Sequence, residues 1–195
     1  MHIIYYISLL LVRLTALIYF RTKVTGKENI PAQGGCILAC NHSSNLDPFI
    51  MGMTTWRYLN FMAKEELFKG RLLSFYWNQV GAFPVKRASA DFRSVREAIR
   101  RLKIGRLLVI FPEGTRSEEG RAKKINPGVG LLVRSAEVPV IPVYLKGTDR
   151  ALPKGSKWFK FCPVHIRLGE PMFFSQEQEN HEIARTIMDK IYELA

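Results

Sequence analysis

Cysteine is scarce in this sequence, and the few that occur limit the chemistry the chain can perform. Cys36, Cys40 and Cys162 form no Cys-x-x-Cys pair and cannot all be joined in disulfides, so a reducing cytoplasmic setting fits best. Cys40 precedes His42 by two residues, which leaves a thiol nucleophile as one alternative; a metal site built from the three cysteines and His165 is another. Free cysteine is usually a small buried hydrophobe. We therefore expect no cysteine nucleophile, no metal and no cofactor.

Acidic residues are also in short supply. The 195 residues include 17 Asp and Glu against 29 Lys and Arg, a net charge of +12. Such an excess requires an anionic partner or surface, and nucleic acid and acidic phospholipid are the two choices. The sequence lacks an RNA-binding signature, zinc-finger spacing and internal repeats. We therefore expect no nucleic-acid partner, and an anionic phospholipid membrane instead.

The apolar N-terminus lacks the small-residue cleavage site of a signal peptide. Residues 3–20 are nearly all apolar, with tyrosines near both ends as in a helix at a membrane interface. Arg13 lies inside this run, and a charge near the bilayer centre costs about 2.5–3.5 kcal/mol, which disfavours a spanning helix. A helix lying in the interface lets Arg13 extend to the headgroups, and Arg21 and Lys23 then keep the rest of the chain on the cytoplasmic side. An ordinary core helix is the alternative.

The remaining chain has the length of one domain, and 47% of all residues are hydrophobic. Apolar or alternating runs predict strands, and amphipathic runs predict helices. Strands are expected near 24–31, 37–39, 59–63, 81–87, 107–111, 138–145 and 164–168, and helices near 48–55, 64–77, 92–103, 128–135 and 176–194. This order predicts an α/β fold with a mixed, mostly parallel sheet flanked by helices. Pro139 and Pro142 predict that their strand is an edge strand or has an interrupted ladder.

The most informative stretch is Asn-His-Ser-Ser-Asn-Leu-Asp at 41–47, followed by Pro48. Asp47 and Pro48 are typical of an N-cap and a first helical residue, so residues 42–47 should form a tight loop after the strand. Residues five apart on one helix point about 140° apart, whereas a loop can place Asp47 against the imidazole of His42. A carboxylate that binds one ring nitrogen leaves the other free to accept a hydroxyl proton. The motif therefore predicts a general base; the alternative is that Asp47 only caps its helix.

Three further blocks accompany this motif. They are Gly-Ala-Phe-Pro-Val-Lys-Arg at 81–87, Phe-Pro-Glu-Gly-Thr-Arg-Ser at 111–117 and Val-Pro-Val-Ile-Pro-Val at 138–143. In this order and spacing, the four blocks resemble the glycerolipid acyltransferase family over residues 24–147. The apolar N-terminus predicts a membrane-associated helix at 1–22, at the cytoplasmic face of the cell membrane. The resemblance implies an acyltransferase domain at 23–195.

The resemblance also implies an activity and a mechanism. His42, oriented by Asp47, removes the proton of the free sn-2 hydroxyl of 1-acyl-sn-glycerol-3-phosphate (lysophosphatidate), and the oxygen attacks an acyl thioester. The donor is acyl-CoA or acyl-ACP, the thioester of acyl carrier protein, and the product is phosphatidic acid, an intermediate of phospholipid biosynthesis. No covalent acyl-enzyme and no metal are needed. An acyltransferase for another lysophospholipid or polar acceptor, and a non-enzymatic basic membrane-binding domain, are the alternatives.

The acceptor site is expected from the second and third blocks. By resemblance, Arg87 and Arg116 hold the phosphate of the acceptor, and Glu113, Gly114 and Thr115 complete the substrate site. Arg116 has the planar fork suited to bidentate phosphate contact, and Gly114 is expected to allow close backbone approach. A structural turn with an Arg–Glu pair is the alternative for the third block, and a solvated surface charge is the alternative for Arg87.

A last cluster lies near the C-terminal end of the domain. Lysines flank large aromatic residues there, a composition suited to a membrane interface. The members are Lys154, Lys157, Trp158, Phe159, Lys160 and Phe161.

Overall fold

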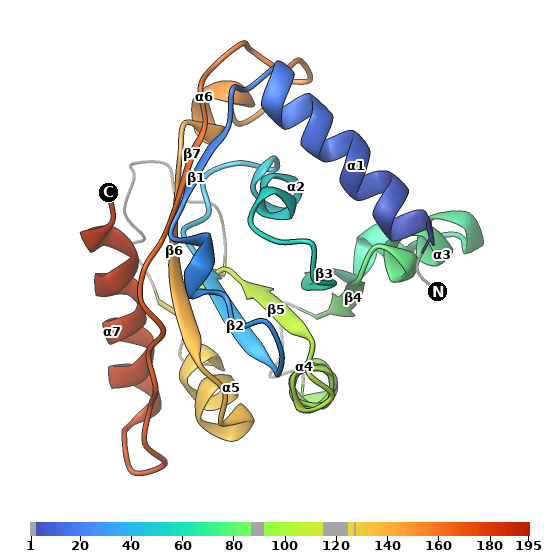
Figure 1. Cartoon of the computed structure of the whole chain (residues 1–195). Coiled ribbons are helices and arrows are strands. Elements are labelled where there is room, and N and C mark those ends of the chain that lie inside the picture. Colours follow the sequence, from blue (N-terminus) through green and yellow to red (C-terminus); the bar gives the residue numbers. More distant parts are fainter. Residues whose placement is uncertain (1–2, 87–91, 115–124, 127) are drawn as a thin grey trace.

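A computed structural model describes residues 3–86, 92–114, 125–126 and 128–195. Within these residues, a seven-stranded sheet has the order β1-β7-β6-β2-β5-β3-β4 (Figure 1). The strands are β1 (Lys23–Thr25), β2 (Cys36–Cys40), β3 (Leu59–Lys64), β4 (Ala82–Val85), β5 (Leu107–Ile110), β6 (Val140–Lys146) and β7 (His165–Leu168). Neighbouring strands pair in parallel except for β6 and β7, which are antiparallel. The predicted mixed, mostly parallel sheet is confirmed.

Helices cover both faces of this sheet (Figure 1). The helices are α1 (Ile3–Ile18), α2 (Asp47–Ile50), α3 (Arg71–Gln79), α4 (Phe92–Lys103), α5 (Gly128–Ala136), α6 (Thr148–Ala151) and α7 (Asn180–Glu193), and the 3-10 segments are η1 (Lys27–Asn29), η2 (Met51–Met53) and η3 (Glu65–Phe68). Ile37 packs in a core cluster with residues of α4, α5 and α7, whereas Leu38 packs in a second cluster with residues of α1 and α2. Consecutive strand residues reach opposite faces of the sheet because strand side chains alternate. Helices must cover both faces, since both faces of a mostly parallel sheet are apolar.

Most predicted elements are present, with shifts at their ends. Helix α4 has the predicted bounds, while its expected cap, Asp91, lies outside the described residues. The helix expected at 48–55 is shorter: α2 ends at Ile50 and continues as η2. Gly52 of η2 lies against α1, since a Cβ there would be 2.8 Å from Leu9 Cδ1. The helical passage expected at 64–77 is divided into η3 and α3. Gly70, the N-cap of α3, lies between them and has a φ of +87°.

Strand β6 differs from expectation in its position. It lies between β2 and β7, so the prediction of an edge strand is wrong. The parallel ladder with β2 continues through Pro142, which is paired with Ala39. The carbonyl of Pro142 accepts the Gly169 N–H, so the polar groups of this proline face β7, where the ladder begins only at Val143. The missing proline N–H therefore interrupts pairing on one side only.

Helix α1 binds the domain through polar contacts as well as buried apolar residues. Arg13 Nε donates to the carbonyl of Gly52 at 3.1 Å and Nη2 donates to that of Thr55 at 2.6 Å. Its guanidinium also lies 3.8 Å from the centroid of the Trp56 ring. The expectation that Arg13 extends to lipid headgroups is therefore wrong, because the backbone carbonyls of Gly52 and Thr55 accept its protons instead. Among the described helices, none combines the length and the apolar character needed to cross a bilayer.

Candidate active site

The loop between β2 and α2 folds Asp47 back onto His42. Asp47 Oδ2 lies 2.8 Å from His42 Nδ1 and accepts the backbone N–H groups of Ser43 and Ser44, each at 2.8 Å. The predicted contact is present. The predicted capping role is wrong, because Leu46 is the N-cap of α2 and Asp47 is its first residue. The carboxylate of Asp47 accepts hydrogen bonds from the N–H groups of the loop rather than from those of the helix.

These contacts favour the tautomer of His42 that carries its proton on Nδ1. Asp47 Oδ2 accepts two backbone N–H groups, which an ionised carboxylate does without any donor of its own. The short contact to His42 Nδ1 is then a hydrogen bond donated by the imidazole. In the neutral ring, Nε2 therefore lacks a proton and can accept one.

The pair is buried and its ring is supported on one face. The Asp47 side chain is 0% exposed, and that of His42 is 11% exposed. The His42 ring stacks on Phe111, with 4.2 Å between ring centroids and 25° between planes. Packing and the carboxylate together hold the orientation of the imidazole, while part of the side chain stays accessible to a substrate.

Hydrogen bonds from distant segments hold the loop in place. The Asn41 side chain donates to the Leu145 carbonyl at 3.0 Å and accepts the Leu145 N–H at 2.7 Å, which joins the end of β2 to β6. Ser44 Oγ donates to the Leu152 carbonyl at 2.8 Å, and Ser43 Oγ lies 3.1 Å from Thr148 Oγ1 of α6. These three side chains in the motif therefore have structural partners, which explains why polar residues surround His42.

Glu113 reaches His42 because β2 and β5 are parallel neighbours. Ala39 pairs with Ile110, so the segments after both strands leave the sheet at the same edge. Glu113 is 7% exposed, and its Oε1 is 3.4 Å from the His42 backbone nitrogen. The same oxygen accepts the hydroxyl of Tyr192 of α7 at 2.9 Å. The sequence predicted no function for this C-terminal helix, and no local signal relates residue 192 to residue 113.

The backbone conformation at Gly114 is one that favours glycine. Its φ is +68°, in the left-handed region that favours glycine. A Cβ at this position would meet nothing nearer than 3.8 Å, the distance to Asn126 Nδ2. The turn after β5 therefore requires the dihedral angle of a glycine, and the expected close backbone approach at the substrate site stays a prediction.

The other expected substrate residues, Arg87, Thr115 and Arg116, lie outside the described residues. The strand that precedes Arg87 does bear on its expected role. β4 ends at Val85 and is parallel to β3, so its carboxyl end lies at the edge that carries His42. Three strand spacings separate β4 from β2, about 14 Å at about 4.8 Å per spacing.

Cysteine chemistry is disfavoured by burial. Cys36, Cys40 and Cys162 are free and buried. Burial raises the pKa of Cys36 to about 12 and holds the pKa of Cys40 well above its ordinary value, so neither thiol is a ready nucleophile. Within the described part of the chain, no cluster of three or more His, Cys, Asp or Glu side chains could hold a metal, and the cysteine site with His165 is therefore not formed.

The buried His–Asp pair at the carboxyl edge of the strands of this α/β domain has the arrangement that general-base chemistry requires. Comparison with known proteins identifies the family. The family model described as "Acyltransferase" matches residues 21–146, more than half of the 195-residue chain. The chain therefore belongs to this acyltransferase family, and the suggested resemblance is confirmed.

Two relatives and one solved structure are informative. The chain is 32% identical over 151 residues to the 1-acyl-sn-glycerol-3-phosphate acyltransferase of Bacillus subtilis, covering 77% of this chain and 73% of that protein. A chloroplastic enzyme of the same name from Brassica napus is 29% identical over 81% of this chain, which spans only 47% of that protein. The crystal structure of the 1-acyl-sn-glycerophosphate (LPA) acyltransferase PlsC from Thermotoga maritima has a TM-score of 0.77 and 30% identity, covering 95% of this chain and 79% of that one.

Proposed function

We propose that this protein transfers an acyl chain from an acyl thioester to the sn-2 hydroxyl of 1-acyl-sn-glycerol-3-phosphate, giving phosphatidic acid. The His42–Asp47 pair is the observation that carries the proposal, since its hydrogen bonds leave His42 Nε2 as a proton acceptor at an accessible sheet edge. The names of the relatives support the choice of acceptor. A domain that only bound membranes would not need a charged side chain that is 0% exposed.

The chemistry requires no covalent acyl-enzyme. His42 Nε2 accepts the hydroxyl proton while the acceptor oxygen attacks the thioester carbonyl, and the carboxylate of Asp47 stabilises the imidazolium that forms. When the carbon–sulfur bond of the tetrahedral intermediate breaks, the departing thiolate takes the proton back from His42. The new ester bond replaces the thioester bond, and the imidazole returns to its starting state.

The acceptor is held at the same edge of the sheet. We assign Arg87 and Arg116 to its phosphate, with Glu113, Gly114 and Thr115 beside it. Guanidinium groups suit this role because they form paired charge-assisted hydrogen bonds with phosphate oxygens. Binding the phosphate orders the glycerol so that its hydroxyl reaches His42, and such positioning accounts for a large part of the rate.

The acceptor is a membrane lipid, and we place the protein at the cytoplasmic face of the cell membrane. The outer side of α1 supports this location, because large apolar side chains that face away from the sheet are exposed to solvent. Those more than 45% exposed are Ile3, Ile7, Leu10, Leu11, Leu14, Leu17 and Ile18. The net charge of +12 suits anionic headgroups.

An acceptor panel tests the function directly. The purified protein is given long-chain acyl-CoA or acyl-ACP together with lysophosphatidate, lysophosphatidylcholine or monoacylglycerol. We expect phosphatidic acid from lysophosphatidate and little transfer to the other two acceptors. Transfer to the neutral or zwitterionic acceptors at the same rate would overturn the assignment of the acceptor.

A charge-conserving variant tests how the acceptor is held. Arg116→Lys keeps the charge but loses the fork, so we expect the rate with lysophosphatidate to fall about tenfold or more while residual transfer to monoacylglycerol is unchanged. Equal losses with both acceptors would assign Arg116 to the fold or to the donor.

A further inference from the structure

The loop between α6 and β7 exposes three large aromatic side chains. Trp158 is 82% exposed, Phe159 51% and Phe161 56%. Aromatic side chains of this size normally bury most of their area, and leaving them in water forfeits the stabilisation that burial would give. The exposed cluster therefore indicates a surface that is covered by something other than this chain.

Internal hydrogen bonds hold this loop in one conformation. The Lys160 N–H donates to the Ala151 carbonyl at 2.7 Å, and the Ser156 N–H donates to the Pro153 carbonyl at 3.0 Å. Ser156 Oγ accepts the Trp158 N–H at 3.2 Å and donates to the Trp158 carbonyl at 2.9 Å. The aromatic rings are thus exposed by a hydrogen-bonded turn.

The charge of the loop identifies the chemistry of its partner. Lys154, Lys157 and Lys160 are exposed, and no acidic residue occurs between Arg150 and Gly169. Aromatic rings next to lysines without acidic neighbours complement the boundary of an anionic bilayer, where rings lie among the headgroups and ammonium groups meet phosphates.

The loop continues the exposed apolar side of α1. The Tyr19 hydroxyl donates to the Phe159 carbonyl at 3.2 Å, and the Tyr19 ring contacts that of Phe161 with 5.5 Å between centroids. The ring of Phe20 contacts that of Phe159 at 5.8 Å. One surface could therefore meet the helix and the loop together.

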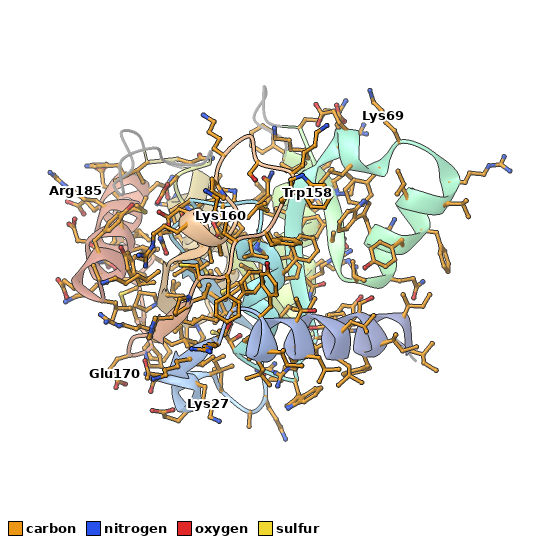
Figure 2. The ribbon with its side chains drawn as sticks, turned by 90° about the horizontal axis from the view of Figure 1, so that it is seen from above. Lys27, Lys69, Trp158, Lys160, Glu170 and Arg185 are labelled. Atoms are coloured by element: carbon orange, nitrogen blue, oxygen red, sulfur yellow. The ribbon has the colours of Figure 1, made fainter. Side chains whose placement is uncertain are left out.

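The base of the same loop is bonded to the catalytic loop. Leu152 accepts the hydroxyl of Ser44, and Thr148 of α6 contacts the hydroxyl of Ser43. Seen from above, Trp158 and Lys160 lie well away from Arg185 on α7 (Figure 2). A surface bound by this loop is thus connected by two hydrogen bonds to the residues beside His42.

We propose that residues 154–161 are a second membrane contact, which binds the headgroup region of anionic phospholipid and places the catalytic edge at the bilayer. Trp158 inserts beside the headgroups, while Lys157 and Lys160 contact lipid phosphates. The proposal deepens the proposed function, since the acceptor resides in that bilayer.

Vesicle binding by the full chain tests the proposal without any acyl transfer. Affinity is measured with vesicles of phosphatidylcholine and with vesicles of equal parts phosphatidylcholine and phosphatidylglycerol. Lys157→Gln/Lys160→Gln should lower the affinity about tenfold for the anionic vesicles alone. Trp158→Ser should lower it about tenfold for both kinds, because the ring contributes apolar area rather than charge.

Matched controls come from other parts of the surface. The double variant Lys27→Gln/Arg185→Gln removes two exposed charges. Phe173→Ser removes a ring that is 78% exposed. Its neighbour Met172 pairs with Val140, the first residue of β6, at the sheet edge opposite to the one that carries His42. We expect both control variants to bind vesicles like the wild type. Thermal unfolding of every variant verifies that the fold is intact.

The possible outcomes separate this proposal from the proposed function. Loop variants that bind both vesicles as the controls do would overturn the membrane contact, even in a protein that acylates lysophosphatidate. A change in oligomeric state with unchanged vesicle binding would assign the loop to a second copy of the chain and also overturn it. Conversely, the expected losses in a protein that fails every acyl-transfer assay would support the contact and count only against the proposed activity.

Discussion

Two regions of this molecule reverse the usual distribution of polarity, in opposite directions. Around His42, a carboxylate that is 0% exposed accepts three hydrogen bonds. On the outer side of α1, Ile18 is 74% exposed and Leu11 61%. A buried charge is tolerated only with such partners, whereas an exposed apolar side chain is merely left unstabilised in water. We therefore propose the first region as the site of the chemistry and the second as a surface for a partner that excludes water.

The largest expected effect concerns the buried region. His42→Ala should lower acyl transfer about 1,000-fold, because the general base is lost. Asp47→Asn should lower it less, since an amide still accepts hydrogen bonds from the loop but stabilises the imidazolium poorly. Steady-state rates with lysophosphatidate measure both, and circular dichroism checks folding. His181→Ala, on an exposed side chain of α7, is the control. Wild-type rates in a folded His42→Ala protein would remove the general-base assignment.

The exposed region is tested by polar substitutions on the outer side of α1. Leu10→Gln/Leu14→Gln/Leu17→Gln should weaken vesicle binding about 100-fold and leave thermal stability nearly unchanged, because all three are about half exposed. Phe92→Gln, on the helix layer across the sheet, is the control. Deleting residues 1–20 is a poorer test, since Phe20 is buried in the core. Unweakened binding by the triple variant would show that α1 does not face the membrane.

A smaller effect is expected where the C-terminal helix meets the buried region. Tyr192→Phe removes the hydroxyl that Glu113 Oε1 accepts, so kcat/KM for lysophosphatidate should fall about tenfold. Tyr144→Phe is the matched control, because its ring contacts that of Tyr192 with 6.1 Å between centroids. Comparing the two variants with phosphate-bearing and neutral acceptors separates a role in acceptor binding from general packing. Equal losses in both variants would indicate packing alone.

The smallest effect concerns how α1 is attached. The Tyr5 hydroxyl donates to the Arg57 carbonyl and accepts the Leu59 N–H, and burial raises the pKa of Tyr5 to about 12. The neutral hydroxyl therefore stabilises the folded state fully below its unfolded pKa of about 10, and this contribution is lost as pH rises through about 12. Tyr5→Phe should cost about 1 kcal/mol at neutral pH.

Chemical denaturation between neutral pH and about pH 12 measures this contribution. The wild type should lose its advantage over Tyr5→Phe in the alkaline part of the range. A constant difference between the two proteins would contradict the role of the hydroxyl.

Local signals in the sequence determined much of this protein. The bounds of α4, the strands of the sheet and the loop that brings Asp47 to His42 follow from periodicity and turn chemistry within a few residues of each position. The spacing of the four blocks indicated the family. These features could be predicted because each depends on interactions between near neighbours in the chain.

The tertiary structure decided the contacts between distant segments. Asn41 bonds to Leu145, and Glu113 bonds to Tyr192. Arg13 bonds to the carbonyls of Gly52 and Thr55 rather than to lipid. The tertiary structure also decided the position of β6. Its prolines predicted an edge strand, but β6 lies between β2 and β7. No periodicity or local propensity encodes these choices, because a hydrogen-bonding group takes whichever partner the packed fold brings within about 3 Å.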